Sequence, residues 1–194
     1  MNKNFSGGGI LPIVDVKTKD GVISCFITFS SYRGVISDAG GKVDINESIQ
    51  KTCVREFFEE SCMLFSINEN NLKDNNLIDV TCGSTFYRVY LPKFSITVNS
   101  SDFTKNYSEI KRQKKSKVYL EKNELVLIPI TERTQSYLYN GRKYYSILDI
   151  NGNVRKVSRR LHKIIKLFNN VSPVVEIINF DKVNKNGILT YTIL

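Results

Sequence analysis

Three glutamates lie at helical spacing in the first half of the chain, where Glu56, Glu59 and Glu60 occupy positions i, i+3 and i+4. At about 100° of rotation per residue, this spacing places the three carboxylates on one face of a helix. Like charges at such spacings destabilise a helix by roughly 0.2–0.5 kcal/mol per pair. Arg55 could offset the repulsion, and a divalent cation would do so more strongly because hard cations bind carboxylate oxygens. The pattern predicts a helix over residues 47–63, and three glutamates alone fit an ordinary solvated face more readily than a cation site.

The residues upstream distinguish this cluster from an ordinary solvated acidic face. Gly40 and Gly41 permit a close backbone approach, and the charge of Glu47 suits the start of a helix. The whole run resembles the Nudix box, GX5EX7REUXEEXGU, in which U is a bulky aliphatic residue. The matching positions are Gly41, Glu47, Arg55, Glu56, Glu59, Glu60 and Met63, with the aromatic Phe57 at the first U. Cys62 replaces the last glycine, where a left-handed backbone would cost about 1–2 kcal/mol.

The resemblance extends beyond the box and covers about residues 8–170. It includes the segments 8–12, 37–42 and 124–130 and the basic helix that starts near residue 157, and it is similar in particular to Nudix domains of large DNA viruses. It implies an α/β fold in which a mixed β-sheet is sandwiched between helices. We expect a single domain over residues 1–194, in which 171–194 adds a C-terminal strand pair.

The resemblance also implies an activity, the hydrolysis of a diphosphate bond in a nucleoside diphosphate linked to another group. Glu56, Glu59 and Glu60 would bind Mg²⁺ or Mn²⁺ together with the backbone carbonyl of Gly40. In some members of the family, the residue at the position of Glu56 acts instead as the general base.

Other residues of the chain would support this site. By the same resemblance, Arg55 would orient the glutamates and Glu47 would pair within the box. A carboxylate from a later strand often acts as a further ligand or base. Glu124 is the first candidate for that catalytic role because it immediately precedes an apolar strand, and Glu121 is the second.

Hydrophobic periodicity indicates the remaining elements. Strands are expected over residues 10–16, 22–29, 77–82, 86–98, 125–130, 174–180 and 188–194. A second amphipathic helix is expected over 157–168. The polar, basic segment 99–117 is expected to form a long loop. Strands interspersed with two helices predict a mixed α/β layer fold.

The positive charge of the chain is local. The net charge is +9, and basic residues concentrate between residues 105 and 122 and between 155 and 166. Such stretches suit a polyanionic partner, although they could equally be solvated faces. The candidate substrate- or RNA-binding residues are Lys42, Lys114, Lys115, Arg159 and Arg160.

Several substrate classes stay open at this point. One hypothesis is a small nucleotide substrate, and another is capped RNA, cleaved by a decapping hydrolase whose basic stretches follow the phosphate backbone. A diphosphoinositol polyphosphate would also suit the charge. A non-catalytic Nudix domain that binds RNA or protein is a further alternative, which the complete set of Arg55, Glu56, Glu59 and Glu60 disfavours.

Composition limits the setting. Four cysteines without a CxxC pair and a single histidine, His162, disfavour a structural zinc site and fit reduced thiols. No apolar run reaches the ~20 residues that a membrane helix needs. We expect a cytoplasmic protein, in the host cytoplasm if it is viral, without a membrane partner; a homodimer is possible in principle. His162 is expected at the surface or its boundary.

Overall fold

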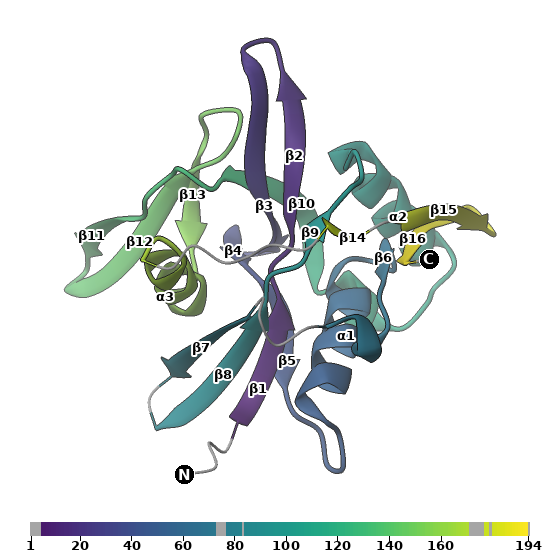
Figure 1. Ribbon diagram of the computed structural model, residues 1–194, viewed down its shortest axis with the longest axis horizontal. Helices are drawn as coiled ribbons and strands as arrows, with labels where there is room; N and C mark the ends of the chain where they lie inside the picture. Colours follow the sequence, from purple (N-terminus) through teal and green to yellow (C-terminus); the bar gives the residue numbers. More distant parts are fainter. Residues whose placement is uncertain (1–4, 73–76, 83, 171–176, 179, 194) are drawn as a thin grey trace.

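The computed structural model describes residues 5–72, 77–82, 84–170, 177–178 and 180–193. These residues form a mixed α/β structure, as the sequence predicts (Figure 1). The α-helices among them are α1 (Ile49–Glu60), α2 (Ser100–Arg112) and α3 (Arg159–Phe168). Two short 3₁₀ turns, η1 (Glu69–Asn71) and η3 (Lys117–Leu120), follow α1 and α2 along the chain. None of the described helices is long and apolar enough to span a membrane.

A four-stranded sheet lies between α1 and α3. Its order is β5 (Ala39–Lys42), β1 (Phe5–Ile10), β8 (Thr85–Tyr90) and β7 (Leu77–Cys82). Strand β1 pairs antiparallel with β5 and parallel with β8, so the sheet is mixed. Cys53 and Phe57 of α1 pack in one buried cluster, and Leu161 of α3 packs in another with Val89. The expected mixed sheet between helices is therefore confirmed.

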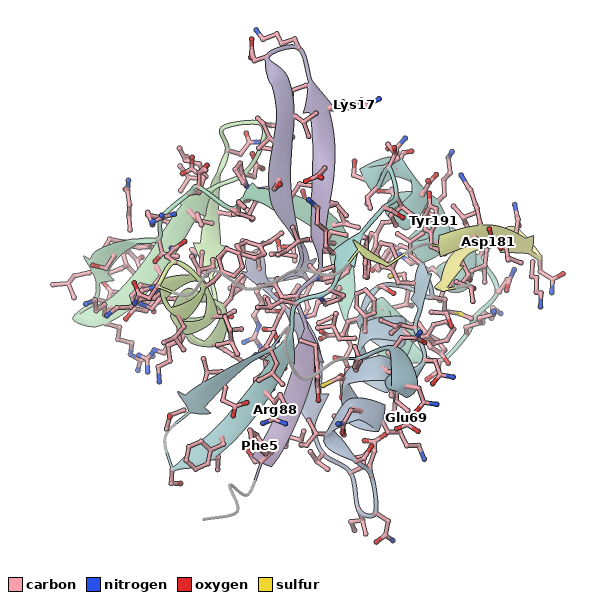
Figure 2. All side chains as sticks on the ribbon, in the orientation of Figure 1. Phe5, Lys17, Glu69, Arg88, Asp181 and Tyr191 are labelled. Atoms are coloured by element: carbon pink, nitrogen blue, oxygen red, sulfur yellow. The ribbon has the colours of Figure 1, made fainter. Side chains whose placement is uncertain are left out.

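The larger sheet contains nine strands among the described residues. Its order is β11 (Gln135–Tyr139), β12 (Arg142–Leu148), β13 (Val154–Val157), β4 (Val35–Ser37), β3 (Gly21–Ser31), β2 (Ile13–Thr18), β9 (Lys93–Phe94) and β14 (Ile177–Ile178), and β10 (Lys122–Pro129) pairs with β3. The β2–β3 hairpin projects from the body of the molecule as a long arm, which carries Lys17 (Figures 1 and 2). Two expected strands, 10–16 and 86–98, are each interrupted, at Pro12 and at Pro92, because proline cannot donate a ladder hydrogen bond.

A third sheet joins the C-terminal hairpin to the residues after α1. Strand β16 (Ile188–Ile193) pairs with β15 (Phe180–Lys185) and with β6 (Phe65–Ser66). Asn186 and Gly187 turn the hairpin with φ of 54° and 78°, the pair of positive angles that a two-residue type I′ turn requires. The first strand of this pair was expected over 174–180 but spans Phe180–Lys185, so its expected bounds were wrong. Residues 174–176 are outside the described part of the chain.

Helix α2 corrects the expectation of a long loop over residues 99–117. The Asn99 side chain caps the helix by accepting from the Ser101 N–H, and Phe103, Asn106 and Ile110 form its buried stripe. Asn106 is buried because its amide bonds the backbone N–H and C=O of Leu189, at 2.9 and 2.6 Å, and the carbonyl of Cys62, at 3.2 Å. A narrow stripe that includes a polar residue gave little periodic signal in the sequence.

Candidate active site

Helix α1 (Ile49–Glu60) lies within the predicted range 47–63 but begins after Glu47, which the first turn of the helix holds in place. The Ser48 hydroxyl caps the helix by accepting from the Lys51 N–H at 3.0 Å. The Thr52 hydroxyl, one turn later, donates to Glu47 Oε2 at 2.7 Å. Glu47 is thus held against the start of the helix by contacts within the motif.

The Arg55 guanidinium connects the acidic residues of the motif. Its Nε and Nη2 donate to the two oxygens of Glu47 at 3.1 and 3.0 Å, and Asp44 lies 3.4 Å from Nη2. Its Nη1 donates to Glu56 Oε1 at 2.8 Å and to Glu59 Oε2 at 3.3 Å. The hydrogen bonds that Arg55 donates to Glu47 lower the pKa of Glu47, and the acceptance of its hydrogen bonds by Glu47 and Glu56 raises the pKa of Arg55. One side chain therefore sets the positions of three carboxylates.

Glycines in β5 make room for these carboxylates. Gly40 and Gly41 pair with Gly9 and Gly8 of β1. A Cβ atom on Gly41 would overlap the carboxylate of Glu56, and one on Gly40 would overlap the Tyr87 hydroxyl. The glycines are therefore needed for space: they let a carboxylate lie directly against the backbone.

Glu60 is the buried member of the cluster. Its Oε2 accepts the Gly40 N–H at 2.8 Å, and its Oε1 lies 2.9 Å from Lys122 Nζ. Burial raises the pKa of Glu60 to about 7, against the opposing effect of Lys122. Desolvation is also the main cause that raises the pKa of Glu59, with a further contribution from the charge of Glu56.

Lys122 is a site residue that the sequence analysis missed. It comes from the start of β10, its side chain is only 11% exposed, and it also donates to Ser37 Oγ at 2.8 Å. The thiol of Cys62 points at the carbonyls of Tyr119 and Lys122, at 3.2 and 3.6 Å, and so links the end of the motif to this segment. The sequence signal was weak, because a lysine before an apolar strand usually marks a solvated strand end.

Arg160 of α3 bonds the backbone beside the glutamates. Its Nη2 donates to the Gly40 carbonyl at 3.1 Å and its Nε to Asp38 Oδ1 at 2.8 Å. Asp38 is fully buried and accepts the Tyr87 hydroxyl at 2.9 Å, while the Arg160 guanidinium lies 4.2 Å from the centre of the Tyr87 ring. Arg160, expected to contact substrate phosphates, is thus committed to an internal ion pair.

The other expected residues differ in how close they lie to the glutamate cluster, and only Lys42 contacts it, where its carbonyl accepts from Arg55 at 3.4 Å. Glu124 forms a bidentate pair with Arg155, at 2.8 and 3.0 Å, and Arg155 also binds Asp149. Its role as a further ligand or base remains a prediction, since its carboxylate pairs with Arg155 rather than with any group of the motif. The remaining expected substrate-binding residues are the exposed Lys42, Lys114 and Arg159 and the half-buried Lys115.

The donor set can be tested for its fit to a divalent cation. Across the described residues, no three Asp, Glu, His or Cys side chains converge closely enough to hold a metal ion. Cations of the chain face the carboxylates instead: Arg55 faces Glu56 and Glu59, and Lys122 faces Glu60. Glu56 Oε1 and Glu59 Oε2 nevertheless both accept from Arg55 Nη1, so these two carboxylates already face one cationic group. Carboxylate and carbonyl oxygens are the ligands that Mg²⁺ and Mn²⁺ prefer, so the chemistry of the donors fits.

Comparisons with known proteins show limited likeness. No family model and no curated protein matches the sequence. A solved MutT/nudix family protein from Enterococcus faecalis aligns over 88% of this chain and 63% of its own, less than two thirds of its length, with 14% identity and a TM-score of 0.49. An Ap4A hydrolase from C. elegans aligns over 46% of this chain and 68% of its own, with 15% identity and a TM-score of 0.36. A MutT/nudix family protein from Listeria innocua aligns over 68% and 82%, with 14% identity and a TM-score of 0.36.

Replacement of Gly41 tests the close approach of Glu56. Gly41→Ala should displace the Glu56 carboxylate, because the added methyl group occupies its position. A shift of about 1 Å at a catalytic group can cost roughly 100-fold in rate, so we expect kcat of the diphosphatase reaction proposed below to fall by about that factor. Circular dichroism should show an unchanged fold. Wild-type turnover in Gly41→Ala would contradict the assignment of Glu56 to the site.

Replacement of Cys62 tests the end of the helix. Cys62 has a φ of 54°, so the left-handed backbone anticipated from the motif is present. Cys62→Ala keeps this strain and loses the buried thiol contacts, whereas Cys62→Gly loses the contacts but relieves the strain. In urea unfolding, Cys62→Gly should therefore be more stable than Cys62→Ala by about 1 kcal/mol. Equal stabilities, or the reverse order, would show that the backbone is not strained there.

Proposed function

We propose that this chain is a Nudix hydrolase that uses Mg²⁺ or Mn²⁺ to cleave the diphosphate of a nucleoside diphosphate linked to another group, or of a related polyphosphate. The observation that supports this most is the contact of Arg55 with Glu47, Glu56 and Glu59 directly beside Gly41. An ordinary solvated acidic face does not require a glycine opposite it. Here Gly41 is needed because its missing side chain leaves the space that the Glu56 carboxylate occupies.

The residues of the site have separable tasks in this reaction. A bound divalent cation would polarise the phosphoryl oxygens and lower the pKa of the attacking water. Arg55 holds Glu56 and Glu59 in fixed orientations, so little reorganisation is needed when the substrate arrives. Glu56, tucked against Gly41, is placed to bind the cation or to accept the proton of the attacking water.

Lys122 gives Glu60 a conditional role. In the metal-free protein, Lys122 compensates the buried charge of Glu60. If Glu60 held the cation, the Lys122 ammonium would be released from this pair and could contact a phosphate oxygen of the substrate. The Gly40 carbonyl, which accepts from Arg160 at 3.1 Å, would be a further ligand to the cation.

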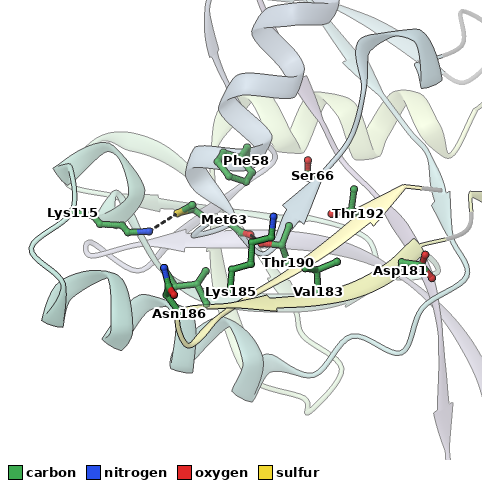
Figure 3. A pocket seen from close by; sticks show the side chains of 11 residues that line it. Phe58, Met63, Ser66, Lys115, Asp181, Val183, Lys185, Asn186, Thr190 and Thr192 are labelled. Atoms are coloured by element: carbon green, nitrogen blue, oxygen red, sulfur yellow. Dashed lines mark hydrogen bonds between the residues drawn. The ribbon is translucent and has the colours of Figure 1, made fainter.

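A cavity of about 580 Å³ lies at the C-terminal end of α1 (Figure 3). Its walls come from the end of the motif, at Phe58 and Met63, from Lys115 and from the C-terminal hairpin. Lys115 is directed into it, 3.9 Å from Met63 Sδ. This volume suits a small ligand, but Glu56, Glu59 and Glu60 do not line it, so we do not include it in the diphosphate site.

A small nucleotide suits the surface better than capped RNA or a diphosphoinositol. Both of those substrates need several exposed cations beside the site. Arg160 is held by Asp38 and Lys115 is half-buried, whereas Lys42, Lys114 and Arg159 are exposed in three separate segments: β5, the turn after α2, and α3.

Removal of single carboxylates tests the function. Glu59→Gln should lower kcat of a Mg²⁺-dependent diphosphatase reaction by at least about 100-fold, and EDTA should abolish the wild-type reaction. Glu60→Gln should have a similar effect on kcat. Products would be quantified by chromatography after incubation with dinucleoside polyphosphates, nucleotide sugars, nucleoside triphosphates, capped RNA and diphosphoinositols.

A matched charge removal outside the site provides the control. Glu132→Gln removes one carboxylate in the segment between β10 and β11 and should leave the rate unchanged. Full activity in Glu59→Gln and Glu60→Gln, or activity that persists in EDTA, would exclude the proposed metal-dependent hydrolase. Absence of any diphosphatase product with all five substrate classes would favour a non-catalytic binding domain.

A further inference from the structure

A second cavity, of about 450 Å³, lies between the β11–β12 hairpin and α3. The motif glutamates do not line it. Its lining brings together three cationic side chains, Arg133, Lys143 and Lys166, and contains no Asp or Glu. Pockets of this size commonly hold small ligands, and the charge of this one points to an anion.

The three cations have no carboxylate partner within the part of the chain that the structure describes. Arg133 donates through Nη1 to backbone carbonyls, the shortest at 2.7 Å to Thr131. Lys143 lies with its Nζ 5.8 Å from the centre of the Tyr145 ring, a neutral partner. Concentrated charge of one sign repels itself and attracts counter-ions. The free protein therefore presents an electrostatically unbalanced pocket.

The hairpin register places the cationic and aromatic groups on the cavity side. Ser136 pairs with Tyr145 and Leu138 with Lys143, so these residues share one face of the hairpin. Ser136, Lys143 and Tyr145 all line the cavity. Tyr137 and Tyr144, which also pair, belong to the opposite face and stack on each other at 5.7 Å.

His162 closes the cavity from α3. Its ring stacks on Tyr145 with centroids 3.7 Å apart and planes 12° apart, and its Nδ1 lies 2.7 Å from the Thr134 hydroxyl. Burial is the main cause that lowers the pKa of His162, and the charges of Lys166, Lys143 and Lys163 lower it further. The imidazole is thus held in place by Tyr145 and Thr134, and the nearby lysines favour its neutral form.

We propose that this cavity is a second ligand site, separate from the glutamate cluster, that binds the phosphate group of a nucleotide unit. Several ammonium and guanidinium groups that line one cavity suit the three oxygens of a phosphate better than a single carboxylate. The cavity volume accommodates a sugar and base beside the phosphate, next to the Asn169 and Asn170 side chains. The nucleotide unit is either a free nucleotide or part of a single-stranded nucleic acid, which present the same chemistry.

The single histidine of the chain makes the binding directly observable. The imidazole proton signals of His162 would be followed by NMR at constant pH in EDTA, during titration with AMP, with inorganic phosphate and with an oligothymidylate of about ten nucleotides. The absence of divalent metal and of turnover keeps this measurement independent of the hydrolase activity. We expect saturable shifts of the His162 signals with AMP.

Charge removal in the cavity should weaken this binding. Each charged hydrogen bond is worth about a factor of ten or more, so Lys143→Gln/Lys166→Gln should raise the dissociation constant for AMP at least about tenfold. The matched control is Lys17→Gln/Lys19→Gln, which removes the same charge from the β2–β3 arm (Figure 2). It should bind AMP as the wild type does.

The remaining outcomes decide between sources or overturn the site. Binding of the oligothymidylate at least about tenfold tighter than AMP would identify a nucleic-acid segment as the ligand, whereas equal or weaker binding would identify a free nucleotide. Shifts that do not saturate, or equal losses of affinity in the cavity variant and the control variant, would overturn the proposal.

Discussion

The contact of Arg55 with the acidic residues around it is the constraint on which the rest of the site depends. Glu47 precedes α1, and Glu56 and Glu59 are half-buried on one face of the helix, so without a central cation their charges would repel one another. The guanidinium binds all three, with the closest contact, to Glu56, at 2.8 Å. Its planar fork is suited to holding several carboxylates at fixed angles. The helix therefore keeps an acidic face in the absence of metal.

The surrounding fold brings backbone and side chains together at this point. Strand β5 runs against β1 through paired glycines, and this places Gly40 and Gly41 beneath the carboxylates. Helix α3 reaches the same strand from the other face of the sheet through Arg160, whose ion pair with Asp38 is buried. The two helices thus meet at one short strand. This arrangement explains why a basic helix far along the sequence belongs to the site structurally, as a support for Gly40.

The local elements and the motif could be predicted from the sequence, whereas the pairing between distant segments could not. Spacing alone placed Glu56, Glu59 and Glu60 on one helix face, because 3.6-residue periodicity is a local property. Glu47 was expected to pair within the motif without a named partner, and in the structure its partner is Arg55. The role of Lys122 depends on the approach of the first residue of β10 to Glu60 of α1, and no local sequence pattern specifies this contact between distant segments. Helix α2 was missed because Asn106, a polar residue, occupies a buried position that only its contacts with Leu189 explain.

Anomalous diffraction from a crystal soaked in Mn²⁺ tests the central claim most directly. The account predicts a Mn²⁺ ion coordinated by Glu56 and Glu59 at about 2.0–2.3 Å, with the Glu60 carboxylate turned away from Lys122 toward the ion. Arg55 should remain bound to Glu47 in the same crystal. A Mn²⁺ ion bound elsewhere, with Glu56 and Glu59 still on Arg55 and Glu60 still on Lys122, would contradict the account. The acidic face would then be a structural ion-pair network.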